Sequence, residues 1–534
     1  MEIKKAPYGS WASPITASLI AQGSITFAGV WLEADGLYWL ENRPFSGGRS
    51  VLCRSRERGE KEEVTPPPFD ARTRVHEYGG GSVTLGKGEV FFSHFPDQRL
   101  YRVRPGETPR PLTAEGPFRY ADGVLDAERG RLIVIREDHG ISDREAQNTV
   151  AAVDLSTGEV TVLEEGHDFY AYPRLSPDGS LLSFIAWDHP RMPWDGTFLY
   201  VAPILPDGRL GEKRQVAGGL EESIFQPEWS PEGTLYYISD RQGWWNLYRL
   251  EGEKGVGLLP MEAEFGEPLW QLGATTYGFA GSDRLVLKYE KDTFSHLAAL
   301  DLKTGRLTPL HLPFTAIQHV KVREGKAAFV GSSPERPMGV ILLDLGTGEW
   351  EERQGSMEAP LDEGYLSRPR PITFPSQGGR KAHALYYPPQ NKDFQGPEGE
   401  KPPLLVFTHG GPTSHVRPSF NLGIQYWTSR GFAVVDVNYG GSTGYGRNYR
   451  ELLKERWGQV DVEDCQAAAH YLVQEGLVDG ERLAIRGRSA GGYTTMAALV
   501  FGDTFKAGAS HFGVSDLEAL AKDTHKLCAG ASMR

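Results

Sequence analysis

Two short phrases recur along residues 20–355 of this chain, and their recurrence constrains its fold more than any other feature. The first phrase, Asp-Leu-x-Thr-Gly, has three copies, of which the last two begin 43 residues apart. These copies are Asp154–Val160, Asp301–Leu307 and Asp344–Trp350. The second phrase, Ser-Pro-Asp-Gly or Ser-Pro-Glu-Gly, occurs at Ser176–Gly179 and Ser230–Gly233, which begin 54 residues apart. Repetition at such periods is typical of proteins that stack copies of one small structural unit.

Both phrases suit turns between short strands. The glycine of Asp-Leu-x-Thr-Gly supplies the positive φ that a hairpin turn needs, and Ser-Pro-Asp-Gly leads into the next strand of the same sheet. A four-stranded unit cannot bury both faces alone, so the units must stack around an axis, which predicts an N-terminal all-β propeller of about seven blades. The blades are expected near residues 20–72, 73–115, 118–165, 171–222, 226–263, 268–310 and 316–355. A β-sandwich, or two small sandwiches, is the alternative.

After Gly355 the sequence changes character. Residues 356–371 are polar and proline-rich and are predicted to be a linker. A hairpin is expected around Gly378 and Gly379, and strands then alternate with helices. The strands are predicted at 403–410, 432–439, 482–487 and 506–512, and the helices at 460–476 and 490–500. This alternation predicts a mostly parallel sheet covered by helices on both faces. The expected domains are therefore 1–355, the propeller with an N-terminal extension, and 372–534.

Composition excludes several classes of protein. The chain has 534 residues, more than one core can organise. Its net charge of −13 is spread along the chain, which argues against a nucleic-acid partner. The N-terminus lacks a signal-peptide core and no apolar run has the length of a membrane span, so no membrane partner is expected. Three distant cysteines, Cys53, Cys465 and Cys528, predict neither disulfides nor a metal cluster, and favour a cytoplasmic location.

Two Gly-x-Ser-x-Gly patterns are present, centred on Ser442 and Ser489. A nucleophile elbow requires a strand, a sharp turn and then a helix, which holds the serine hydroxyl above the sheet. Ser489 has this context, because a strand precedes it and an apolar helix follows, whereas Ser442 is followed by a glycine-rich loop. Gly487 and Gly491 allow the tight turn and the close packing of helix on strand. Ser489 is therefore predicted to be a catalytic nucleophile; the alternative is a helix N-cap serine.

An oxyanion hole is expected beside this serine. In such elbows one donor is the N–H of the residue after the nucleophile, here Ala490, and another comes from a loop after an earlier strand. The loop His409–Pro412 follows such a strand, and its two glycines let backbone N–H groups approach a substrate oxygen. Gly411 is the predicted second donor, with Gly410 as the alternative. A plain Gly-Gly-Pro turn without this role is the other possibility.

Several motifs resemble the prolyl oligopeptidase family of serine peptidases, in particular its acylaminoacyl-peptidase and dipeptidyl-aminopeptidase-like branch. They occur in the family's order over nearly the whole chain. They are Arg74–Gly81, Ser239–Tyr248, Thr408–Pro412, Asn438–Arg447, Trp457–Cys465 and Gly487–Tyr493. The resemblance implies a propeller that caps an α/β-hydrolase domain, short peptide substrates admitted between the two domains, and an acyl-enzyme on Ser489.

The end of the chain departs from that family. The resemblance places the catalytic Asp and His on loops after the last two strands of the sheet, and the triad order is Ser, Asp, His. Here one predicted strand follows the elbow helix, and the chain then closes on Leu527–Arg534. The acids and histidines after the elbow are Asp503, Asp516, Asp523, His511 and His525. None is in the expected position, so the chain is expected to be a truncated member with an incomplete hydrolase domain and without its catalytic Asp and His.

Three functions remain open from the sequence. The first is a serine peptidase for short or N-acylated peptides, with doubtful activity in this truncated chain. The second is an esterase with the same elbow, and the third is a catalytically dead propeller-based binding protein. No cofactor is expected, since no cluster has metal-ligand spacing and Gly79–Gly81 and Gly440–Gly446 lack a nucleotide-binding pattern. The oligomeric state is left open.

Overall fold

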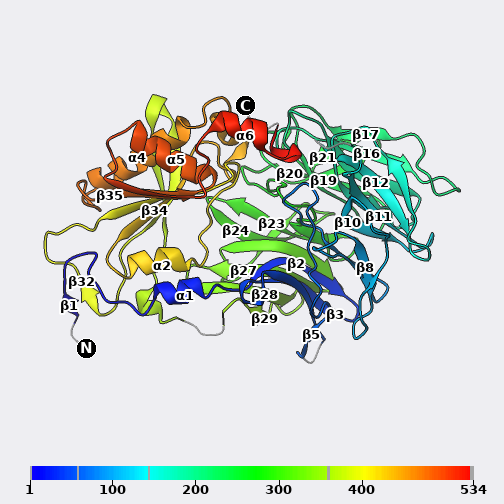
Figure 1. The fold of residues 1–534 in the computed structure, drawn as a ribbon, viewed down its shortest axis with the longest axis horizontal. Coiled ribbons are helices and arrows are strands. Elements are labelled where there is room, and N and C mark those ends of the chain that lie inside the picture. Colours follow the sequence, from blue (N-terminus) through cyan, green and yellow to red (C-terminus); the bar gives the residue numbers. More distant parts are fainter. Residues whose placement is uncertain (1–2, 57–58, 142–144, 358–360, 530–534) are drawn as a thin grey trace.

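The computed structural model describes residues 3–56, 59–141, 145–357 and 361–529. It has two parts side by side, a ring of small antiparallel sheets and an α/β-hydrolase domain with one larger sheet (Figure 1). Within the described residues the ring contains seven four-stranded sheets, each formed by four consecutive strands. This confirms the predicted seven-bladed propeller.

The blades follow one another along the chain. Blades one to four comprise β2 (Thr26–Glu33), β3 (Gly36–Arg43), β4 (Arg49–Ser55) and β5 (Lys61–Glu63); β6 (Val83–Gly86), β7 (Glu89–Ser93), β8 (Leu100–Val103) and β9 (Arg110–Pro111); β10 (Phe118–Asp126), β11 (Arg131–Asp138), β12 (Gln147–Asp154) and β13 (Val160–Glu164); β14 (Phe169–Leu175), β15 (Leu181–Trp187), β16 (Phe198–Pro203) and β17 (Arg214–Gly218). Blades five to seven comprise β18 (Ile224–Trp229), β19 (Leu235–Ser239), β20 (Asn246–Glu251) and β21 (Lys254–Gly257); β22 (Tyr277–Phe279), β23 (Arg284–Lys291), β24 (Phe294–Asp301) and β25 (Leu307–Leu310); β26 (Ala316–Arg323), β27 (Lys326–Ser333), β28 (Arg336–Asp344) and β29 (Trp350–Gly355).

The repeated phrases are the turns that they were predicted to be. Each Asp-Leu-x-Thr-Gly copy joins the third strand of a blade to the fourth, as between β12 and β13. Asp154 closes that turn, since its Oδ1 accepts the backbone N–H groups of Ser156 and Thr157 at 2.8 Å each. Gly158 adopts a φ of 74°, in the left-handed region that favours glycine. The two Ser-Pro phrases join the first strand of a blade to the second, as between β14 and β15.

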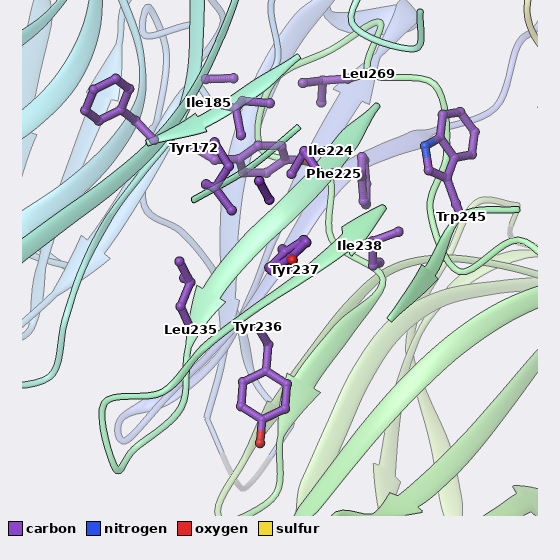
Figure 2. Packing of buried hydrophobic residues seen from close by; sticks show 14 of the residues in the cluster. Tyr172, Ile185, Ile224, Phe225, Leu235, Tyr236, Tyr237, Ile238, Trp245 and Leu269 are labelled. Carbon is purple, nitrogen blue, oxygen red and sulfur yellow. The ribbon is translucent and has the colours of Figure 1, made fainter. Parts of the chain in front are cut away.

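Buried aromatic and aliphatic side chains fill the space between neighbouring blades. Figure 2 shows Tyr172 and Ile185 of the fourth blade close to Ile224 and Phe225 of the fifth, and these residues belong to one hydrophobic cluster. All four are at most 2% exposed. This packing between blades provides the burial that a single blade could not provide alone.

The hydrolase sheet has the strand order β30-β31-β34-β33-β35-β36. These strands are β30 (Arg370–Pro375), β31 (Lys381–Tyr387), β34 (Ala433–Asn438), β33 (Leu404–Thr408), β35 (Leu483–Arg488) and β36 (Ala507–His511). The last four are parallel to one another, as predicted, whereas β30 and β31 form the expected antiparallel hairpin. Helices α4 (Val460–Gln474) and α5 (Ala490–Val500) cover one face, and α2 (Leu422–Thr428) covers the other (Figure 1).

Short helices lie between the larger elements. The single-turn helices are η1 (Pro44–Ser46), η2 (Glu363–Tyr365), η3 (Gln377–Gly379) and η4 (Glu451–Leu453). The remaining α-helices are α1 (Ala17–Ala21), α3 (Gly446–Arg450), α6 (Leu517–Asp523) and α7 (Lys526–Ala529). The N-terminal extension was predicted to be part of the propeller domain. In the structure its first strand pairs with a strand of the hydrolase domain. There β1 (Lys4–Lys5) pairs in parallel with β32 (Phe394–Gln395).

Candidate active site

Ser489 lies at a sharp turn between a strand and a helix. It follows β35 directly and precedes α5, with a φ of 54° and a ψ of −124°. A positive φ at a non-glycine residue is strained, and such strain is typical of a nucleophile elbow. The Ser489 side chain forms no capping hydrogen bond to the helix, and the residue is exposed. Its backbone therefore differs from that of an ordinary N-cap serine, which is extended and bonds into the first turn.

Two glycines make this turn possible. A Cβ atom on Gly487 would lie 2.3 Å from the carbonyl oxygen of Gly491, and one on Gly491 would lie 2.2 Å from the carbonyl oxygen of Thr408. Both distances are far shorter than a van der Waals contact, and both neighbours are backbone atoms that cannot rotate away. The start of α5 therefore sits directly on the end of β33 because neither glycine has a side chain.

The serine of the other Gly-x-Ser-x-Gly pattern is inaccessible. Ser442 is 0% exposed, and its hydroxyl is 2.8 Å from Nε2 of His409. The His409 ring stacks on Tyr439 at a centroid distance of 4.3 Å, and its Nδ1 is 2.8 Å from the carbonyl oxygen of Gly410. Burial lowers the pKa of His409 to about 4, so the ring is neutral near pH 7. Both ring nitrogens of His409 are thus engaged by Gly410 and Ser442, and no hydrogen bond to Ser489 is found in the described part of the chain.

The predicted oxyanion donors lie beside Ser489. A Cβ atom on Gly410 would be 3.3 Å from Cβ of Ser489, and Ser489, Ala490 and Gly411 all line one cavity of about 350 Å³. Among the described residues, the backbone N–H groups of Gly410, Gly411 and Ala490 form no hydrogen bond. Free backbone donors around an exposed hydroxyl are the arrangement that stabilises a developing oxyanion. Gly411 lines the cavity and Gly410 does not, which favours Gly411 as the donor.

Both domains build the walls of this cavity. The propeller contributes Tyr78, Met192, Trp194 and Trp270, and the hydrolase domain contributes Trp457. The ring centroids of Trp194 and Trp270 are 4.5 Å apart, and those of Tyr78 and Trp270 are 5.1 Å apart. Four aromatic side chains therefore line the cavity that contains Ser489, beside charged side chains such as Arg450, Glu451 and Lys454. Nothing in the local sequence around Trp194 or Trp270 indicated this role, because each reaches the cavity only through the packing of propeller on hydrolase.

The propeller also holds the segment that follows the Gly-Gly-Pro loop. Nε1 of Trp270 donates to the carbonyl oxygen of Thr413 at 2.7 Å. Glu290 in β23 is 1% exposed and accepts from Nε2 of His415 at 2.7 Å and from Nε of Arg417 at 2.8 Å. Although burial raises the pKa of Glu290, Arg417, the neighbouring lysine and His415 hold it well below its ordinary value. Glu290 is thus an ionised anchor between the two domains.

The histidines after the elbow differ in their positions. His511 is exposed at the end of β36, and its carbonyl oxygen accepts the backbone N–H of Ser489 at 3.0 Å. His525 lines the same cavity as Ser489, with its ring 5.2 Å from that of Tyr78 and its Nδ1 without a partner in the described part of the chain. Burial lowers the pKa of His525. Among described residues, no hydrogen bond joins the Ser489 hydroxyl to a histidine or a carboxylate.

Of the aspartates that follow the elbow, Asp516 has a structural role. Asp516 caps α6, since its Oδ1 accepts the backbone N–H groups of Glu518 and Ala519 at 2.8 and 3.0 Å. Asp503 is exposed, and the side chain of Asp523 lies outside the described residues. In the described ranges no helix is both long and apolar enough to span a bilayer. No group of metal-ligating side chains is found over the same ranges.

Comparison with known proteins finds similarity to peptidases. The profile of the prolyl oligopeptidase family matches residues 418–533. The structure of a Mycobacterium tuberculosis puromycin-hydrolyzing peptidase is 41% identical, with a TM-score of 0.95 over 99% of this chain and 83% of that one. A puromycin hydrolase structure is also 41% identical, with a TM-score of 0.93 over 99% of this chain and 84% of the other.

Curated relatives are more distant. Dipeptidyl aminopeptidase BIII of Pseudoxanthomonas mexicana is 25% identical over 420 residues, which cover 74% of this chain and 57% of that protein. The acylamino-acid-releasing enzyme of Arabidopsis thaliana is 36% identical over 97 residues, which are 18% of this chain and 13% of that protein. The matched region thus spans little more than half of the first of these proteins.

Proposed function

This chain belongs to the prolyl oligopeptidase family of serine peptidases, and we propose that it hydrolyses short or N-acylated peptides through an acyl-enzyme on Ser489. One observation carries the proposal. The hydroxyl of Ser489 stands exposed at a strained elbow, in a cavity that Ala490 and Gly411 also line, and the N–H groups of these two residues have no partner among the described residues. A nucleophile and oxyanion donors in one cavity are what acyl transfer requires.

The chemistry follows from these positions. Oγ of Ser489 attacks the carbonyl carbon of the scissile bond, and the carbonyl oxygen becomes an oxyanion that accepts hydrogen bonds from Ala490 and Gly411. Collapse of this intermediate expels the amine, which takes up the proton that the serine hydroxyl has lost, and leaves an ester on Ser489. Water then attacks the ester and releases the acid product. The two N–H groups act mainly on the transition state, where the oxygen carries the negative charge.

Attack by Ser489 also requires that a base takes up the proton of its hydroxyl. A base has to come within about 3 Å of the hydroxyl. The family resemblance places that base and its acid on loops after the last two strands of the sheet, and the described residues join no histidine to Ser489. The proposal is therefore that these residues alone acylate slowly, because an oxyanion hole without its base retains only part of the catalysis.

The cavity suggests the substrate. Its aromatic wall, built by Trp194, Trp270, Tyr78 and Trp457, suits an apolar or aromatic side chain next to the scissile bond. Two structures at 41% identity are named for the hydrolysis of puromycin. Puromycin and short peptides with an aromatic residue are thus the first substrates to assay.

A fluorophosphonate probe tests the nucleophile directly. Purified chain is incubated with the probe, and the modified residue is mapped by mass spectrometry. The proposal expects the label on Ser489 and not on Ser442, no label in Ser489→Ala, and unchanged labelling in Ser156→Ala, an exposed propeller serine. Absence of label from the wild-type chain, or equal labelling of Ser489→Ala, would refute the proposal. Turnover of a peptide amide beside the matched ester separates a peptidase from an esterase.

A further inference from the structure

Asp461 is a buried carboxylate that joins two parts of the candidate active site. It lies in the first turn of α4 and is 0% exposed. Its Oδ2 accepts from Oγ1 of Thr494 in the elbow helix at 2.5 Å, and its Oδ1 accepts the N–H of Gly458 at 2.7 Å. Gly458 follows Trp457, which lines the cavity that contains Ser489. We propose, on the basis of the function proposed above, that Asp461 is a positioning residue that holds Trp457 and the elbow helix in a fixed relation.

The first hydrogen bond reaches the start of the elbow helix. Helices α4 and α5 lie side by side on one face of the sheet (Figure 1). Thr494 is 1% exposed and lies one helical turn after Ala490, whose carbonyl oxygen is 3.2 Å from Oγ1 of Thr494. Ala490 supplies the predicted oxyanion N–H and directly follows Ser489. Asp461 therefore fixes the turn of α5 that begins at the nucleophile.

The second hydrogen bond reaches the wall of the cavity. Gly458 has a φ of 86°, and a Cβ atom there would lie 2.8 Å from Oη of Tyr493 in α5. The ring of Trp457 meets the ring of Tyr493 edge to face, with the centroids 5.4 Å apart. Residues 457–458 thus contact the elbow helix directly and Asp461 through a hydrogen bond. A displacement of Asp461 would move Trp457 and α5 relative to each other.

Helix capping alone does not explain Asp461. An acid in the first turn of a helix often accepts an N–H from the residues before it, and the bond from Gly458 is of this kind. The bond from Thr494 instead joins two helices across 33 positions of the chain. A surface aspartate would cap α4 without the cost of burying a charge. In the described part of the chain Asp461 forms no ion pair, so its hydrogen bonds compensate its burial.

The ionised carboxylate accepts both bonds, and an asparagine can replace it. Burial raises the pKa of Asp461 to about 6, whereas the hydrogen bonds from Thr494 and Gly458 lower it, so Asp461 is ionised at pH 8. An asparagine of the same shape can also serve both partners. Its Oδ1 accepts from Gly458, and its amide donates to Oγ1 of Thr494, whose hydroxyl then donates to the carbonyl oxygen of Ala490.

Three substitutions test the proposal. Asp461→Ala removes both hydrogen bonds, Asp461→Asn keeps both, and Thr494→Val removes only the bond to the elbow helix in a side chain of similar shape. The measurement is the second-order rate constant with which two phosphonate probes label Ser489 at pH 8. The probes are alike except that one carries a benzyl and the other a methyl side chain. The methyl rate reports the elbow, and the benzyl-to-methyl ratio reports the contact with Trp457.

Each variant has its own expected result. A misplacement of about 1 Å at a reacting centre costs about 100-fold in rate, so Asp461→Ala should slow the methyl probe by about 10-fold to 100-fold. Its benzyl-to-methyl ratio should also fall by about tenfold, as in Trp457→Ala, because an apolar contact in a pocket is worth about that much. Thr494→Val should slow both probes by about tenfold with the ratio unchanged. Asp461→Asn should match wild type in both readouts.

Asp479→Ala is the matched control. Its carboxylate also accepts a backbone N–H, that of Glu481 at 3.0 Å, but Asp479 does not line the cavity. This variant should label with both probes at the wild-type rates. A loss of stability alone cannot imitate the expected result for Asp461→Ala, because it would leave the ratio of the two probes unchanged among folded molecules.

Three results would overturn the proposal. The first is labelling of Asp461→Ala with the wild-type rate and ratio, and the second is a loss in Asp461→Ala that Asp461→Asn does not recover. The third, which applies even if Asp461→Ala does not fold, is labelling of Thr494→Val at the wild-type rate. Each result would show that Asp461 does not set the geometry of the site.

Failure of the proposed function is a separate outcome. If neither probe labels the wild-type chain, the proposed function fails, and hydrogen exchange at the Gly458 amide tests the positioning by itself. Exchange there should be faster in Asp461→Ala than in wild type and should return to the wild-type rate in Asp461→Asn. Equal exchange in Asp461→Ala and wild type would refute the positioning role.

Discussion

The contact between the elbow helix and β33 can be tested by adding one methyl group. Gly491 lies in the first turn of α5, and a Cβ atom there would be 2.2 Å from the Thr408 carbonyl oxygen and 2.7 Å from that of His409. Ordinary contacts begin at 3.4 Å, so Gly491→Ala must move the helix and the strand apart by about 1 Å. Overpacking of a tight site costs about 1–3 kcal/mol. A misplacement of about 1 Å at a reacting centre costs about 100-fold in rate.

Two measurements follow both consequences of Gly491→Ala. Urea unfolding should show a loss of about 1–3 kcal/mol in the free energy of unfolding. The rate of fluorophosphonate labelling at Ser489 should fall by about 100-fold, because Ser489 and Ala490 move relative to Gly411. Gly480→Ala is the matched control. Its Cβ would meet only the side chain of Val473, at 3.2 Å, and that side chain can adjust.

A specific result would refute this reasoning. If Gly491→Ala unfolds at the wild-type urea concentration and is labelled at the wild-type rate, the glycine is not required for the approach of α5 to β33. If stability falls but labelling does not, the strain is relieved away from Ser489. The claim that this contact sets the geometry of the site would then be wrong.

Three further predictions concern other parts of the protein. Burial raises the pKa of Asp436 to about 7, so its contribution to stability is present below about pH 4 and is lost as the pH rises through 7. Asp436→Asn should remove this loss and add up to about 4 kcal/mol at pH 8 in urea unfolding, whereas a wild-type pH dependence would contradict the assignment. Glu290→Ala removes the carboxylate that accepts from Arg417 at 2.8 Å and pairs with the buried Lys288 at 3.1 Å, which should cost about 3–5 kcal/mol in unfolding experiments; a cost near zero would exclude the anchor role. Phe512 is 95% exposed beside β36, whose five residues are all exposed, so Phe512→Ser should reduce self-association in sedimentation, and unchanged association would show that this edge is not involved.

Much of the fold could be predicted from local patterns. The Asp-Leu-x-Thr-Gly turns need only an aspartate that accepts nearby backbone N–H groups and a glycine at positive φ, both within five residues. Helix α4 was predicted because its apolar residues repeat at the helical period, and Val462, Cys465 and Leu472 are indeed buried. Such features depend on neighbours along the chain, which the sequence contains.

The elbow at Ser489 depends partly on the local sequence and partly on the tertiary structure. The strand before it, the glycines around it and the helix after it are local, so the elbow was predicted correctly as a turn. The sequence also suggested an N-cap as the alternative, and the backbone angles of Ser489 distinguish the two. Its catalytic role stays a prediction until the labelling experiment is done.

Two contacts of the site join residues that are far apart in the chain. Ser442 meets His409 across 33 positions, and Trp270 meets Thr413 across 143. Periodicity and composition carry no information about such pairs, since each forms only when whole domains pack. The amino-acid pattern was therefore enough to specify strands, turns, helices and the elbow, which arise from short-range sterics and hydrogen bonding. The burial of one Gly-x-Ser-x-Gly serine, the exposure of the other and the aromatic wall around it were set by packing between elements, because solvent access depends on what the rest of the chain covers.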